Sequence, residues 1–223
     1  MQVLVIGATR GTGRLVVDQL LAAGHDVRAT VRDPGQAEEL TSAGATTVLA
    51  DLEGDLGDAF EGVDAVMFCA GSGSKTGPDA TLRVDLHGAV RTVDACLAGG
   101  VSRYVMLSSM AADDPMRGSE GMRHYLAAKH AADRILLGSG LEATVVRPGG
   151  LTDDPPTGAV EVGVPTLGHR GRIPRADVAA VMVACLEQRA GRGVAFEVLA
   201  GEQPIAEAVA GLDPAERGVS PDR

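Results

Sequence analysis

The sequence predicts an α/β fold, a doubly wound parallel sheet with helices on both faces that forms a three-layer α/β/α sandwich. Short apolar, β-branched segments alternate with helical segments along the 223 residues. The strand segments are continuously apolar rather than alternating, which is typical of parallel strands buried on both faces. This alternation implies right-handed crossover connections within one sheet. We therefore predict strands over residues 2–6, 27–31, 46–50, 65–69, 103–107, 143–147 and 194–199.

Helices are predicted between these strands, over residues 13–23, 35–43, 79–98, 122–138 and 175–189. In the third helix, apolar residues recur at three- and four-residue spacing and predict one buried stripe, made of Leu82, Leu86, Val90, Val93 and Leu97. The chain length suits one domain, and we assign residues 1–210 to it. The remaining residues, 211–223, form a polar tail that we expect to fray.

Two segments, 71–78 and 148–171, do not show the pattern of a helix or a strand. Both follow the C-terminal end of a predicted strand, where open α/β sheets bind their ligands. The alternative is that they are exposed connections. The second is rich in Pro and Gly and long for an unstructured loop in a compact domain. We therefore expect both to be substrate loops.

Composition and charge exclude several classes of function. The formal net charge of −10 repels nucleic acid and anionic membranes, so neither is expected as a partner. No apolar run approaches the roughly 18 residues of a membrane span, and the N-terminus lacks the basic region of a signal peptide. Cys69, Cys96 and Cys185 lie far apart, and the histidines lack His-Glu-x-x-His spacing, so no metal site is predicted. We expect a cytoplasmic protein that binds a small-molecule substrate, as a monomer or a homo-oligomer.

A glycine-rich turn, with Gly7, Gly11 and Gly13, separates the first predicted strand from the first predicted helix. Such a sharp turn needs residues without a Cβ, and the bare backbone lets a diphosphate approach the helix N-terminus. Unpaired N–H groups and the helix dipole stabilise negative charge there. A glycine triplet alone is a weak signal, but its position between strand and helix favours a dinucleotide-binding Rossmann turn. The alternative is a structural turn in a protein that binds no nucleotide.

The segment Gly-Ala-Thr-Arg-Gly-Thr-Gly-Arg at 7–14 resembles the atypical branch of the short-chain dehydrogenase/reductase family. Further motifs similar to that branch follow in the same order: Ser108-Ser109, Tyr125-Leu-Ala-Ala-Lys129, Val146-Arg-Pro-Gly149 and Arg175-Ala-Asp-Val-Ala179. The similarity spans about residues 1–210, and within the branch it is greatest to small NAD(P)H-binding and flavin-reductase-like members. It implies an NAD(P)-dependent oxidoreductase and leaves the substrate open.

The resemblance also implies a set of cofactor contacts. It places at the cofactor Gly7, Thr9, Arg10, Gly11, Thr12, Gly13, Arg32, Asp51, Leu52, Ala70, Gly71, Ser72, Ser108, Lys129 and Pro148. Within this set, Asp51 either accepts a hydrogen bond from the adenine amino group, with Leu52 packed nearby, or caps a helix. Both interpretations stay open.

The end of the second predicted strand bears on the choice between NADP and NAD. NAD-binding relatives usually place an acidic residue there, where it binds both ribose hydroxyls. Here that position is Val31, followed by Arg32, whose guanidinium can bind a 2′-phosphate through paired hydrogen bonds. The resemblance places a second basic residue, Arg10, beside it. Asp33 could hold the ribose of NAD, but its place before Pro34 is more typical of a turn or helix start. We predict NADP, with NAD less favoured; the alternative for Arg32 is a solvated arginine.

Tyr125 and Lys129 are four residues apart on a predicted helix and share one face. In the family, the lysine holds the nicotinamide ribose and makes the tyrosine phenol a better acid, and the phenol transfers the proton. The resemblance makes Ser109 the hydroxyl that holds the substrate oxygen, with Ser108 turned toward the cofactor or the core. The alternatives are a half-buried tyrosine beside a surface lysine, and serines that bond only to the backbone. Tyr104, inside a strand, is predicted to be a packing residue.

These observations predict hydride transfer between the nicotinamide and a small carbonyl, quinone or flavin-like acceptor, with Tyr125 as acid or base. One alternative is a sugar-nucleotide epimerase or dehydratase, although extended members of the family carry a larger C-terminal substrate domain. Another is a non-catalytic NADP-binding redox sensor, although such proteins commonly lack the tyrosine–lysine pair.

Overall fold

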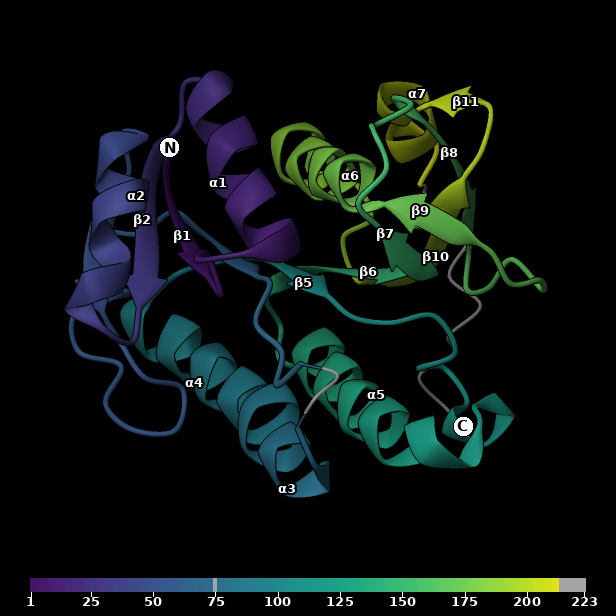
Figure 1. The fold of residues 1–223 in the computed structure, drawn as a ribbon, viewed down its shortest axis with the longest axis horizontal. Helices are drawn as coiled ribbons and strands as arrows, with labels where there is room; N and C mark the ends of the chain where they lie inside the picture. Colours follow the sequence, from purple (N-terminus) through teal and green to yellow (C-terminus); the bar gives the residue numbers. More distant parts are fainter. Residues whose placement is uncertain (74–75, 213–223) are drawn as a thin grey trace.

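The computed structural model describes residues 1–73 and 76–212, which are arranged in three layers around one long sheet (Figure 1). Its strands lie in the order β11-β8-β10-β6-β5-β4-β1-β2-β3. From β3 to β10 every neighbouring pair is parallel, so the predicted doubly wound parallel sheet is confirmed. At the other edge, β8 pairs antiparallel with both β10 and β11, which the sequence did not predict.

The strands of the long sheet are β1 (Gln2–Ile6), β2 (Asp26–Val31), β3 (Thr46–Leu49), β4 (Ala65–Phe68), β5 (Arg103–Leu107), β6 (Glu142–Pro148), β8 (Ala159–Gly163), β10 (Val194–Ala200) and β11 (Gln203–Pro204). Two further strands, β7 (Gly150–Thr152) and β9 (Arg172–Pro174), pair separately. Each strand predicted from the sequence agrees with an observed one to within one residue at either end.

The α-helices are α1 (Gly11–Ala22), α2 (Ala37–Ser42), α3 (Pro78–Ala80), α4 (Ala89–Gly99), α5 (Arg123–Gly138), α6 (Arg175–Gln188) and α7 (Ile205–Ala210). Short 3₁₀ segments are η1 (Pro34–Gln36), η3 (Pro115–Arg117) and η4 (Glu120–Met122), and η2 (Thr81–Gly88) is a π-helix. Helices α1 and α6 pack together on one face of the sheet, and α4 and α5 pack together on the other (Figure 1). None of the helices in the described part of the chain is long and apolar enough to cross a membrane.

The two faces of the sheet bury separate apolar clusters. On β1, Val3 and Val5 belong to the cluster under α1 and α6, whereas Leu4 and Ile6 belong to the cluster under α4 and α5. Successive side chains of a strand point to opposite faces, so an uninterrupted apolar strand serves both clusters. The burial of both faces therefore explains the continuously apolar strand segments in the sequence.

The predicted helix over 79–98 is observed as one uninterrupted helical stretch, but its helix types and its buried face differ from the prediction. It consists of α3, the π-helix η2 and α4, and the predicted stripe of leucines and valines is wrong at its ends. Leu82 and Leu97 are about half exposed (53% and 52%). The face that turns inward is one position earlier and is made of small and polar residues: Thr81, Asp85, Gly88, Ala89, Thr92, Val93 and Cys96. Polar contacts with α5 and β5, described below, orient this face inward.

The prediction of an irregular segment over 148–171 is also wrong, because β7 and β8 lie within it. These strands are short, and their pairing depends on β9, β10 and β11, which are distant in sequence. The other predicted loop, 71–78, is irregular through Gly77 where it is described, and α3 begins at Pro78. Of the predicted tail, Gly211 and Leu212 are described, and the rest lies outside the described residues.

Candidate functional site

The glycine turn between β1 and α1 is shaped by close backbone packing. Gly7 has a φ of +82°, and a Cβ there would lie 2.6 Å from the backbone nitrogen of Ala70. A Cβ on Gly13 would overlap the carbonyl oxygen of Gly7. Both positions require glycine because other parts of the backbone already occupy the space of a side chain.

Gly11 differs from these two glycines because a Cβ there would not clash with its surroundings. Its φ is +56°, and among the described residues the only atom within 4 Å of a Cβ, outside its own helical turn, is Arg175 Nε at 3.9 Å. The first turn of α1 contains no acidic residue, and no side chain caps its N–H groups. The turn therefore offers free N–H donors and the positive end of a helix dipole to an anion, which fits the diphosphate of a dinucleotide.

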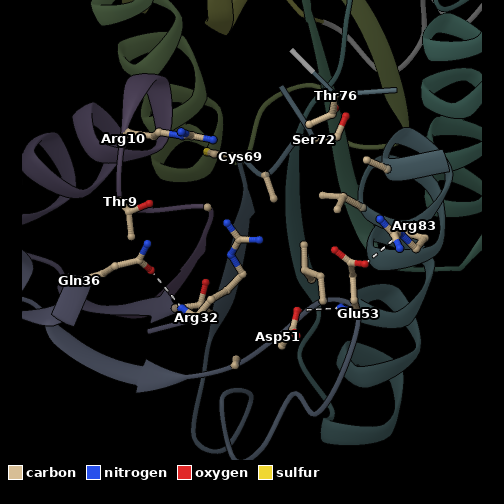
Figure 2. Close-up of a pocket in the computed structure, with 18 residues that line it drawn as sticks. Thr9, Arg10, Arg32, Gln36, Asp51, Glu53, Cys69, Ser72, Thr76 and Arg83 are labelled. Carbon is tan, nitrogen blue, oxygen red and sulfur yellow. Dashed lines mark hydrogen bonds and ion pairs between the residues drawn. The ribbon is translucent and has the colours of Figure 1, made fainter. Parts of the chain in front are cut away.

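A cavity of about 420 Å³ opens beside this turn, at the C-terminal ends of β1, β2, β3 and β4 (Figure 2). Many of the predicted cofactor residues line it: Gly7, Thr9, Arg10, Arg32, Asp51, Leu52, Ala70, Gly71 and Ser72. The fold thus brings together four strand ends that are separated by up to about sixty residues in sequence, as expected for the ligand edge of an open sheet.

One wall of the cavity is cationic. Figure 2 shows the guanidinium groups of Arg10 and Arg32 directed into the cavity. Neither forms an ion pair with a carboxylate of the described residues, and the backbone N–H of Arg32 donates to Gln36 Oε1 (3.2 Å). Asp33, the residue that could have held the ribose of NAD, instead accepts a hydrogen bond from the N–H of Gly35 (2.9 Å) and caps η1. Its predicted place at the start of a helix is confirmed.

The opposite wall of the cavity is formed by a turn that follows β3 and is held in place by hydrogen bonds and an ion pair. Asp51 Oδ1 accepts a hydrogen bond from the N–H of Glu53 (3.0 Å), so this carboxylate caps a turn and lines the cavity, and no helix begins there. Glu53 pairs with Arg83 of η2 at 3.0 Å. Arg91 of α4 donates to the carbonyls of Leu52 (2.7 Å) and Gly54 (2.5 Å). These contacts hold Asp51 and Leu52 at the cavity.

Sequence reasoning missed a second group of lining residues: Thr30, Gln36, Ala50, Glu53, Cys69, Thr76, Ala80, Arg83 and Val84. Ala80, Arg83 and Val84 come from the helical segment after the loop at 71–78, and their place after a predicted substrate loop is a signal that could have identified them. Cys69 directly follows β4 beside the glycine turn, and burial raises the pKa of its thiol to about 12. The thiol is therefore neutral near neutral pH.

The predicted catalytic residues are not among the described residues that line this cavity. Tyr125 is half-buried in the first turn of α5. Lys129, one turn later, is 2% exposed, and its Nζ donates to the carbonyl of Leu107 at the end of β5 (2.8 Å). The same Nζ lies 3.9 Å from Asp85 Oδ1 and 5.9 Å from the centre of the Phe68 ring. Lys129 is therefore a buried cation rather than a surface lysine.

Asp85 connects this lysine to the cofactor cavity. Its Oδ2 accepts a hydrogen bond from the N–H of Ser72, which lines the cavity (3.0 Å), and its side chain is 1% exposed. Its other oxygen, Oδ1, has no hydrogen-bond partner in the described structure, and it faces Gly71, where a Cβ would lie 3.1 Å away. The sequence analysis did not identify Asp85. Asp85 lies outside the apolar stripe predicted for its helix, so the sequence offered no signal that it faces inward.

The two serines at the end of β5 point in different directions. Ser108 Oγ donates to Asp133 Oδ2 (2.9 Å), which also accepts from Arg147 Nε (2.9 Å). Burial raises the pKa of Asp133, although Arg147 and Ser108 oppose the shift. Ser108 thus faces the core, one of its two expected orientations. Ser109 is half-buried, and its hydroxyl donates to the carbonyl of Met110 (3.3 Å).

The remaining predicted residues belong to the framework. Pro148 is buried at the end of β6, and its carbonyl accepts from the N–H of Met110 (2.9 Å). Thr12 is buried in the first turn of α1. Tyr104, predicted to be a packing residue, is fully buried on β5, and its hydroxyl bonds to Thr92 Oγ1 (2.6 Å).

Comparison with known proteins gives consistent matches. A family model described as NAD(P)H-binding matches residues 7–189. An uncharacterized sugar epimerase of Bacillus subtilis (strain 168), YhfK, is 41% identical over 213 residues, covering 94% of this chain and 99% of that protein. A solved structure from Bacillus halodurans, named for the NAD-dependent epimerase/dehydratase class, has a TM-score of 0.92 at 42% identity and covers 95% of this chain and 100% of that one. The oxidoreductase ylbE of Lactococcus lactis has a TM-score of 0.85 at 25% identity, over 95% and 96% of the two chains.

Proposed function

Because this chain belongs to the NAD(P)H-binding family, we propose that it is an NADP-dependent oxidoreductase. The reaction is hydride transfer between the nicotinamide and a small carbonyl, quinone or flavin-like acceptor. The observation that carries the proposal is the cavity beside the glycine turn, with two arginines of its wall, Arg10 and Arg32, directed into it. The chemistry that the bound cofactor supplies is the hydride, and the protein supplies position, charge and a proton.

The preference for NADP follows from charge at the end of β2. Arg10 and Arg32 offer two guanidinium groups that no carboxylate of the described residues neutralises, and a 2′-phosphate would do so. The nearby carboxylate, Asp33, is engaged by its own turn. Among the described residues at the end of β2, no carboxylate is free to bind a ribose 2′-hydroxyl, and cations lie there in its place.

Tyr125 is the proposed acid or base, and Ser109 the hydroxyl that holds the reacting oxygen. Both are half-buried, Ser109 just after β5 and Tyr125 in the first turn of α5, so a substrate could reach them, whereas Lys129 is only 2% exposed. Lys129, one turn after Tyr125 on α5, carries the positive charge of this region. Asp85, bonded to the cavity wall, holds this cation in place.

The test is a calorimetric titration with NADPH and NADH, followed by turnover assays with aldehyde, quinone and flavin acceptors. We expect tighter binding of NADPH and consumption of NADPH with at least one acceptor. Tight binding of NADPH with no turnover on the whole panel would contradict catalysis and favour a redox sensor.

A second candidate function is a sugar-nucleotide epimerase or dehydratase, in which the cofactor is oxidised or reduced only transiently. The names of the Bacillus subtilis and Bacillus halodurans relatives favour it. This chain covers 99% and 100% of those two relatives, so the length of the matched region does not separate the two candidates. Interconversion of a nucleotide sugar without net change in NADPH absorbance would support the epimerase and contradict a net reductase.

A further inference from the structure

Arg175, the first residue of α6, brings a further cation to the glycine turn, beside Gly11. Helix α6 packs against α1, and this contact places Arg175 Nε 3.9 Å from the position that a Cβ on Gly11 would occupy. Apart from the turn of helix to which Gly11 itself belongs, no other atom in the described part of the chain lies within 4 Å of that position.

The space between Gly11 and Arg175 is not needed for packing. Gly7 and Gly13 exclude a side chain because the backbone is in contact with them, whereas a Cβ on Gly11 would make only an ordinary van der Waals contact, with Arg175 Nε. Its φ of +56° favours glycine but is also tolerated by asparagine and aspartate. Gly11 is the first residue of α1, so an anion bound by the N–H groups of that first turn would lie near the guanidinium group of Arg175.

The guanidinium group of Arg175 has donors to spare. Its Nη1 donates to Asp153 Oδ1 (2.7 Å), and the Asp153 side chain is 90% exposed. A guanidinium has five N–H donors, so this contact leaves Nε and Nη2, and Nε is the atom that faces Gly11. We propose that Arg175 binds the diphosphate of the cofactor through these remaining donors. This inference rests on the proposed binding of a dinucleotide.

The role differs from that of Arg32. Arg32 lies at the end of β2, where it would distinguish a 2′-phosphate from a hydroxyl. The diphosphate is common to NADPH, NADH and ADP-ribose, so a contact with it contributes equally to the binding of all three ligands. Arg175 would therefore set the overall affinity, and Arg32 the preference among nucleotides.

The experiment is calorimetric titration of wild type, Arg175→Ala and Arg32→Ala with NADPH, NADH and ADP-ribose. We expect Arg175→Ala to lower the affinity for all three ligands by about tenfold to a hundredfold, the usual effect of losing a charged hydrogen bond. Arg32→Ala should lower the affinity for NADPH alone. Arg192→Ala removes an equal charge near the other end of α6, and should leave all three affinities unchanged.

A second variant separates the cation from its ion pair. Asp153→Asn breaks the pair with Arg175 but keeps the guanidinium, so affinity should stay the same or increase. An equal loss in Asp153→Asn and Arg175→Ala would assign the effect to the ion pair and overturn the proposal. So would an Arg175→Ala variant that binds ADP-ribose as wild type does. Failure of wild type to bind any of the three ligands would overturn the proposed function itself.

Discussion

Lys129 and Asp85 form an ion pair in the interior of the protein, with 3.9 Å between Nζ and Oδ1, and their side chains are 2% and 1% exposed. The lysine is on α5, one turn after Tyr125, and the aspartate is on η2, where it also binds the N–H of Ser72. Because water reaches neither charge, each depends on the other for stabilisation. The pair therefore connects the helix of the proposed acid to the wall of the cofactor cavity.

The first prediction concerns this pair. Asp85→Asn leaves the Lys129 ammonium buried without a counter-charge and should reduce the free energy of unfolding by about 3–5 kcal/mol. Adding Lys129→Met removes the unpaired charge and should restore a large part of the loss. Urea denaturation of the wild type, both single variants and the double variant measures the coupling. Additive effects of the two substitutions would contradict the interaction.

The second prediction concerns Tyr125. Tyr125→Phe removes the proposed proton donor and should lower kcat on a carbonyl acceptor by about 10²–10⁴-fold, with unchanged NADPH affinity. Tyr104→Phe is the matched control because its hydroxyl bonds only within the core, to Thr92. That variant should lose about 1 kcal/mol of stability and keep its turnover. A Tyr125→Phe enzyme as fast as wild type would exclude the acid role.

The third prediction concerns Arg32. Arg32→Ala should weaken the binding of NADPH by about 1.5–3 kcal/mol and hardly affect the binding of NADH, because only NADPH carries the 2′-phosphate. Arg83 lines the same cavity but is paired with Glu53 and Asp79, so Arg83→Ala should not change the ratio of the two affinities. Calorimetry with both nucleotides measures that ratio. Equal affinities for NADPH and NADH in the wild-type protein would refute the NADP assignment.

The fourth prediction compares two glycines of the turn. Gly11→Ala adds a methyl group without a clash and should leave the protein folded, at a cost of about 1–2 kcal/mol for its φ of +56°. It should weaken nucleotide binding by about 1–3 kcal/mol through overpacking against the diphosphate. Gly13→Ala forces its methyl group into the Gly7 carbonyl and should destabilise the fold itself. Thermal unfolding and NADPH titration distinguish the two effects. Normal nucleotide binding by folded Gly11→Ala would place the phosphates elsewhere.

The fifth prediction concerns pH and the carboxylate of Glu142. A hydrogen bond from Arg189, supported by Arg192 and Arg103, holds the pKa of this carboxyl below its ordinary 4.5. A lowered pKa contributes stability that is present above 4.5 and is lost as the pH falls through the folded value. Glu142→Gln should therefore be less stable than wild type by about 0.5–1 kcal/mol at neutral pH, and this difference should vanish well below pH 4.5. Glu202→Gln, at an exposed glutamate, is the control for removing one charge.

The predictable part of the fold is the part that depends on local pattern. Strands such as β1 and β5 are short apolar runs, and the glycine turn follows β1 directly, so their order and place could be predicted. The inward face of the helical stretch that contains Leu82 and Leu97 could not be predicted from local pattern. The pairing of Asp85 with Lys129 and of Thr92 with Tyr104 decides that face, and both pairs join segments distant in sequence.

The sequence by itself determined the doubly wound sheet and the glycine-rich turn between β1 and α1, because strand burial and turn chemistry are properties of neighbouring residues. It also indicated Arg10 and Arg32, which line the cavity beside that turn. Only the tertiary structure decided that Ser108 faces Asp133, that Lys129 is enclosed beside Asp85, and that Arg175 faces Gly11. Each of these contacts joins separate helices or strands, and their geometry is set by how the layers pack on the sheet.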